Sequence, residues 1–87
     1  MFVILVYDIN IKRVGKVLKT SRKYLNWVQN SVLEGDITEA NFVKLKHELL
    51  SKINKEEDSI LFYIFRSKTY SKREEYGLKK GGEDIFL

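Results

Sequence analysis

Asp8 is the residue whose type and position most suggest chemistry. It follows six apolar or aromatic residues and lies near the end of a segment, residues 2–9, with the composition of a buried strand. Sites are common at the carboxyl ends of strands. A carboxylate there can bind a divalent cation or accept hydrogen bonds from the following turn. Since Asn10 can also cap that turn, the residues alone leave both roles open.

Basic residues follow Asp8 closely along the chain. Lys12, Arg13 and Lys16 would lie in the first two turns of a helix, where the helix dipole disfavours positive charge in the first turn. Such a breach of a local rule is typical of a functional surface. The three side chains could hold a phosphate backbone beside Asp8, although a solvated helix face has the same pattern.

The charge of the chain is distributed unevenly. Residues 9–33 contain six basic residues and no acidic one, whereas residues 34–58 contain seven acidic residues and four lysines. Residues 66–80 are basic again, six to two. Two separate basic segments favour a polyanionic partner, and nucleic acid is the polyanion that we expect.

Other catalytic arrangements find little support. The chain has no cysteine, and its one histidine, His47, has no recognisable catalytic partner. Phosphate-binding glycine motifs do not occur. Metal-assisted cleavage of a phosphodiester usually needs two or more carboxylates. A two-fold dimer could supply one Asp8 from each chain to a shared site, and Mg²⁺ suits such a site because it retains water and phosphate ligands.

Hydrophobic periodicity predicts strands that alternate with helices. The predicted elements are a strand over 2–9, a helix over 11–25, a strand over 27–34 with a bulge or break at Asn30-Ser31, a helix capped by Asp36 or Thr38 with Phe42, Leu45, Leu49 and Ile53 buried, and a strand over 59–65. Residues 66–87 are expected to form a polar loop with a short apolar end. The fold class that follows is α+β, a ferredoxin-like βαββαβ sandwich with an antiparallel sheet and two helices on one face.

The length predicts one domain over residues 1–80, followed by a tail over residues 81–87 that frays or adds an edge strand to the other protomer. A chain of 87 residues without cysteine buries limited surface, so we expect a homodimer. The longest apolar run, residues 1–7, is too short to span a bilayer and lacks a basic start. The expectation is a cytoplasmic protein with no membrane partner.

Several short segments together resemble the CRISPR-associated protein 2 family. They are VYDI around Asp8, Arg13-Val14, VQNSVLEG before Asp36-Ile37-Thr38, and Glu57-Asp58-Ser59-Ile60. These segments occur in the family's order over about residues 1–65.

The resemblance implies a homodimer whose C-terminal strand docks on the other protomer. It implies that Asp8 is the catalytic residue and binds Mg²⁺ together with its dimer mate, and that Lys12, Arg13 and Lys16 contact DNA or RNA. One function then expected is a subunit for CRISPR adaptation with metal-dependent endonuclease activity. The alternative is a non-catalytic bridge that holds duplex DNA and integrase subunits during spacer acquisition. A related toxin-type RNA nuclease would share the fold and the strand-end aspartate.

Overall fold

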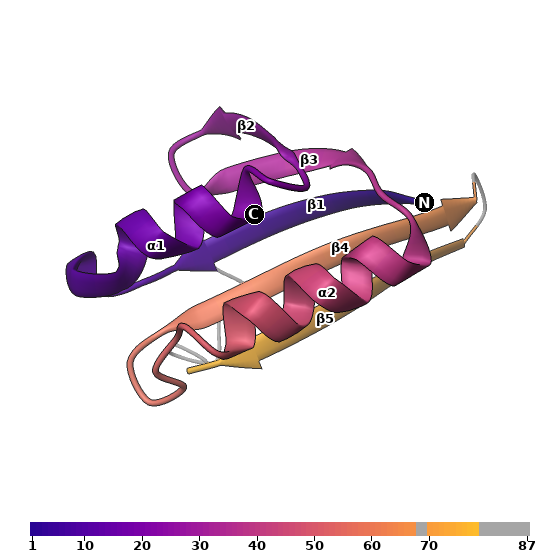
Figure 1. The fold of residues 1–87 in the computed structure, drawn as a ribbon. Coiled ribbons are helices and arrows are strands. Elements are labelled where there is room, and N and C mark those ends of the chain that lie inside the picture. The colour runs from indigo at the N-terminus through magenta and orange to yellow at the C-terminus, as the bar shows by residue number, and fades with distance from the viewer. Residues whose placement is uncertain (68–69, 79–87) are drawn as a thin grey trace.

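The structure, a computed structural model, describes residues 1–67 and 70–78 (Figure 1). Their elements in chain order are β1 (Phe2–Asp8), α1 (Ile11–Ser21), β2 (Asn26–Gln29), β3 (Val32–Asp36), α2 (Glu39–Leu50), β4 (Ser59–Ser67) and β5 (Tyr70–Gly77). The strands form one antiparallel sheet in the order β2-β3-β1-β4-β5, and both helices cover the same face of it. The predicted α+β ferredoxin-like fold is confirmed, with β5 as an additional edge strand.

The core lies between the sheet and the two helices. Alternate residues of β1, namely Val3, Leu5 and Tyr7, are buried beneath the helices. Leu5 lies opposite Leu33 of β3 and Phe62 of β4, and both are buried too. Because strand side chains alternate between faces, the other residues of β1, including Asp8, belong to the face that the helices leave open.

Both helices are shorter than the periodicity predicts. The first ends at Ser21, where the backbone bonds change from four residues to three: the N–H groups of Lys23 and Tyr24 donate to the carbonyls of Thr20 and Ser21, and the chain then turns. Leu25 is still buried, but from this turn rather than from the helix.

The second helix is capped by Thr38, whose hydroxyl accepts a bond from the backbone N–H of Asn41 at 3.1 Å, so of the two predicted caps Thr38 is the one used. It ends at Leu50, and Ile53 packs against the core from the following turn.

Two regions differ from the predicted elements. The segment over residues 27–34, predicted as a strand with a bulge or break at Asn30-Ser31, is a hairpin of β2 and β3 that turns at this break, and Asn30 takes φ 42°. Asparagine tolerates this left-handed conformation better than most residues. The predicted loop after residue 66 includes β5, which pairs with β4 along its length. The tail over residues 81–87 lies outside the described residues.

Candidate nucleic-acid and metal site

Asp8 closes β1 on the face of the sheet opposite the helices. It lies opposite Ser59, the first residue of β4, and its side chain is half-buried. Two residues, Ile9 and Asn10, connect it to α1. The fold therefore places the carboxylate at a strand end, immediately before the basic helix, as the sequence predicts.

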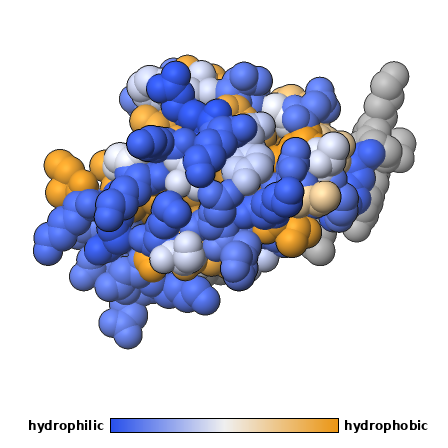
Figure 2. Space-filling view, viewed as in Figure 1, coloured by the Kyte–Doolittle hydropathy of each residue, from blue (hydrophilic) through white to orange (hydrophobic). Residues whose placement is uncertain are grey.

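Lys12 and Lys16 project from α1 into solvent. Together with Lys19 they form the basic face of α1, and all three side chains are exposed. None of them takes part in an ion pair among the described residues. Figure 2 shows that hydrophilic residues cover most of the surface on the helix side. The two lysines are thus available to phosphate groups.

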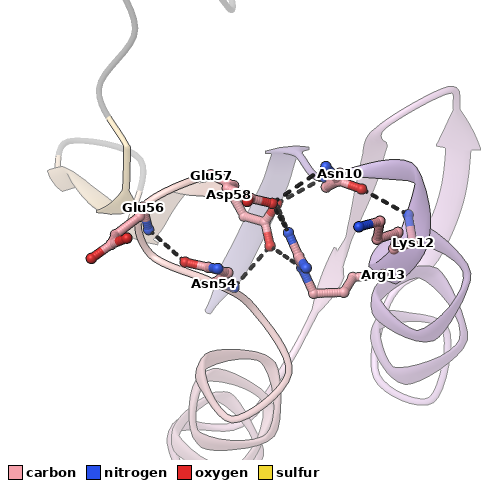
Figure 3. Close-up of polar contacts among 7 residues, drawn as sticks. All are labelled: Asn10, Lys12, Arg13, Asn54, Glu56, Glu57 and Asp58. Carbon is pink, nitrogen blue, oxygen red and sulfur yellow. Dashed lines mark hydrogen bonds and ion pairs between the residues drawn. The ribbon is translucent and has the colours of Figure 1, made fainter.

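Arg13 lies in a different environment from the two lysines. It donates from Nε to Oδ2 of Asp58 at 2.6 Å and from Nη2 to Oδ1 of Asp58 at 3.1 Å (Figure 3). Its Nη2 also donates to Oε1 of Glu57 at 2.7 Å. The guanidinium therefore ties the first turn of α1 to the turn before β4.

Asp58 is the centre of this arrangement, and its side chain is fully buried. Besides Arg13, the backbone N–H groups of Asn10 and Asn54 donate to its carboxylate, each at 2.8 Å. We call Asn10, Arg13, Asn54, Glu57 and Asp58 the Asp58 cluster (Figure 3).

The electrostatics of the cluster follow from these contacts. Burial alone would raise the pKa of Asp58, but the hydrogen bonds from Arg13 and from the two backbone amides lower this pKa to about 2. The hydrogen bond to Asp58, followed by that to Glu57, raises the pKa of Arg13 above its usual value. The Asp58 carboxylate and the Arg13 guanidinium are therefore both charged throughout the neutral pH range. The cluster holds the loop after Asp8 in place through the bond from Asn10.

In the sequence, Asp58 stands out only as part of Glu57-Asp58-Ser59-Ile60, one of the segments that carry the family resemblance. Its partner Arg13 lies 45 residues earlier, so no local pattern connects the two. The one local sign in the sequence is that Asp58 directly precedes a largely apolar strand, whereas Asp8 follows an apolar run.

The described residues of a single chain offer few side chains that could bind a metal ion at this site. Within residues 1–67 and 70–78, no three His, Cys, Asp or Glu side chains gather into a metal-binding group. The carboxylate of Asp8 is a hard oxygen donor of the kind that Mg²⁺ prefers, and this ion needs only one or two protein carboxylates. The residues present therefore fit Mg²⁺ as one part of a site whose other ligands come from water, phosphate or a second chain.

A ferredoxin-like sheet with an aspartate at the end of its central strand, beside a basic helix, defines a small α+β protein with a surface suited to nucleic acid. The family model described as CRISPR associated protein Cas2 matches residues 1–73. The chain belongs to the Cas2 family.

Relatives and solved structures agree with this assignment. Proteins named CRISPR-associated endoribonuclease Cas2 from Dictyoglomus turgidum and Thermotoga maritima are 55% and 51% identical over 87 residues; the alignments cover all of this chain and 100% and 99% of those proteins. The crystal structure of Streptococcus pyogenes Cas2 matches with a TM-score of 0.70 at 40% identity, covering 79% of this chain and 89% of that chain. In the part of the chain that the structure describes, no helix is long and apolar enough to cross a membrane.

Proposed function

We propose that this chain is a CRISPR-associated, Mg²⁺-dependent endonuclease that cleaves RNA or DNA through Asp8. The observation that carries the proposal is the position of Asp8 at the end of β1, separated by two residues from the basic helix α1. Support also comes from relatives that share about half of this sequence and are named endoribonuclease.

Asp8 is the proposed metal ligand. When bound, Mg²⁺ supplies a more acidic water and offsets negative charge on the phosphate that is cleaved. The chain's own contribution is to fix the carboxylate at the strand end, because the Asp58 cluster anchors the backbone at Asn10, two residues later.

A second copy of the chain is the proposed source of the missing carboxylate. The open face of the sheet presents Phe2, Ile4 and Val6 of β1, which are half-buried, and Phe65 of β4, which is 39% exposed. Asp8 belongs to this same face. Two copies that pack face to face would cover these apolar residues and bring their Asp8 side chains to one shared site.

Lys12, Arg13 and Lys16 are the proposed contacts to the nucleic-acid backbone. The two lysines are exposed, and the side chain of Arg13 is 22% exposed despite its ion pairs. No hydrogen bond among the described residues uses Nη1 of Arg13. This atom can donate to a phosphate while the rest of the guanidinium stays bound to Asp58.

A non-catalytic bridge is the second candidate function. In that case the dimer holds duplex DNA and integrase subunits in the cytoplasm during spacer acquisition, with no chemistry of its own. The observation that favours it is that the described residues of one chain contain no group of three metal-binding side chains.

A cleavage assay separates the two functions. Labelled single-stranded RNA and duplex DNA are incubated with the wild type, Asp8→Asn and the control Asp36→Asn, in Mg²⁺ or EDTA. Asp36 is an exposed carboxylate that lies opposite Phe2, at the other end of β1. We expect EDTA and Asp8→Asn to abolish cleavage and Asp36→Asn to preserve it. Equal cleavage by Asp8→Asn would contradict the nuclease site, and DNA binding without cleavage by any of the proteins would favour the bridge.

A further inference from the structure

A shallow hollow of about 290 Å³ lies on α1, apart from Asp8 and the Asp58 cluster. Gly15, Leu18, Lys19 and Arg22 line it. Their spacing of three and four residues places them on one side of the helix, roughly opposite the buried Val17. The volume is at the low end for small-molecule sites, which suits a single flat ring better than a larger ligand.

Gly15 leaves open space on this side of α1 because it has no side chain. It lies inside the helix, where glycine is the least favourable residue after proline. A side chain at this position would meet no heavy atom within 4 Å, so the fold of the chain does not require a glycine here. A glycine that the fold does not require is explained by close approach of another molecule, because no side chain then separates that molecule from the helix backbone.

Arg22 forms one wall of the hollow and is held in place by the hairpin. Its guanidinium lies over the ring of Trp27, with Cζ 5.6 Å from the ring centroid. The indole N–H of Trp27 donates to the carbonyl of Asn30 at 2.9 Å, which fixes the ring on the hairpin. Guanidinium planes and aromatic rings are the surfaces on which unpaired bases stack.

The charge around the hollow selects the kind of ligand. Residues 9–33 contain no acidic residue, and neither Lys19 nor Arg22 belongs to an ion pair among the described residues. An exposed aromatic ring bordered by uncompensated positive charge favours nucleic acid over a peptide ligand.

We propose that this hollow receives one unpaired base of a single-stranded nucleic acid. The base stacks on the guanidinium of Arg22, which Trp27 supports from behind, and Lys19 contacts a neighbouring phosphate. The inference rests on the proposed nucleic-acid function and deepens it by naming the form of nucleic acid that binds. A duplex keeps its bases stacked and cannot insert one into the hollow. This side of α1 should therefore bind single strands in preference to a duplex.

Binding is tested by fluorescence anisotropy with three labelled probes of equal length: single-stranded RNA, an abasic oligonucleotide and duplex DNA. The variants are Gly15→Met, which fills the hollow, and Trp27→Ala, which removes the support for Arg22. Gly15→Ala and Ala40→Met are the controls, the latter placing the same side chain at an exposed position of α2. We expect Gly15→Met to weaken binding of single-stranded RNA about tenfold. Binding of the abasic and duplex probes should change little, and Ala40→Met should match the wild type.

The wild type offers a second readout, because Trp27 is the only tryptophan of the chain. Single-stranded RNA should quench its fluorescence, and the abasic probe should not. If the wild type binds RNA and both variants bind it equally well, the inference is wrong while the proposed function stands. Equal loss for all three probes would also overturn it, since that result indicates lost backbone contacts or a damaged fold. If the wild type binds no probe, the proposed function fails together with the inference.

Discussion

Protonation of Asp58 should destabilise the fold at acid pH. Its pKa is about 2 in the folded protein, against 3.8 for an ordinary aspartate. Because the folded pKa is the lower one, the carboxylate contributes stability fully above about pH 5, and this contribution is lost as the pH falls toward 2. The difference between these two pKa values corresponds to about 2 kcal/mol of unfolding free energy.

The substitution Asp58→Asn removes the charge while it keeps the size of the side chain. One oxygen can still accept a bond, but the amide group then faces donors from Asn10, Asn54 or Arg13. An unpaired donor at a buried position, together with the loss of a charged partner, should cost about 3 kcal/mol at pH 7. Glu57→Gln is the matched control, because Glu57 binds the same Arg13 but its side chain is 51% exposed. This control should change stability little.

Urea unfolding followed by circular dichroism, at one protein concentration and at pH values from 7 to 2, measures the effect. We expect the difference in unfolding free energy between the wild type and Asp58→Asn to shrink by about 2 kcal/mol between pH 6 and pH 2. The control should follow the wild type at every pH. A difference between wild type and Asp58→Asn that stays constant with pH would refute the reasoning, because the carboxylate would then have an ordinary pKa in the folded state.

Three further predictions concern other parts of the molecule. Gly77→Ala should lower the unfolding free energy by about 2 kcal/mol or more, because Gly77 has φ 102° and a Cβ there would lie 2.0 Å from the carbonyl oxygen of Asp58. An unchanged melting temperature in a thermal melt would contradict this. Replacing Lys12 and Lys16 by Gln should reduce the slope of log binding constant against log salt by about two, and an unaltered slope would exclude them as phosphate contacts. Phe65→Glu should shift the protein from dimer to monomer in sedimentation, whereas a persistent dimer would place the interface elsewhere.

The elements that the sequence predicts well are those with a clear hydrophobic pattern. β1 and β4 are nearly continuous apolar runs, and both appear within a few residues of their predicted bounds. β5 was missed because its described side chains at 73–75 are charged and show no alternation, which is typical of an edge strand. The break between β2 and β3 lies at Asn30-Ser31, where the sequence predicts a bulge or break, but without a strong Asn-Gly signal the sequence does not identify it as a hairpin turn.

In the candidate site, the sequence predicts what depends on neighbouring residues and does not predict what depends on residues far apart in the chain. Asp8 and Lys12 are only four residues apart, so a strand that ends at Asp8 and a helix capped by Asn10 suffice to predict that the basic helix follows Asp8 directly along the chain. The pairing of Arg13 with Asp58 depends on how β4 returns beside β1, which only the complete sheet determines. The hollow at Gly15 arises from a missing side chain, and the sequence shows that glycine without showing what surrounds it.

Cleavage by mixed dimers is the strongest test of a shared Asp8 site. Wild-type and Asp8→Asn chains are refolded together in equal amounts so that subunits pair at random, and the initial rate on single-stranded RNA is measured in Mg²⁺. If one Asp8 from each chain is needed, only dimers of two wild-type chains cleave, and about one quarter of the rate of an all wild-type sample should remain at equal total protein. A remaining rate of about one half would show that each chain acts alone, and would contradict the shared site.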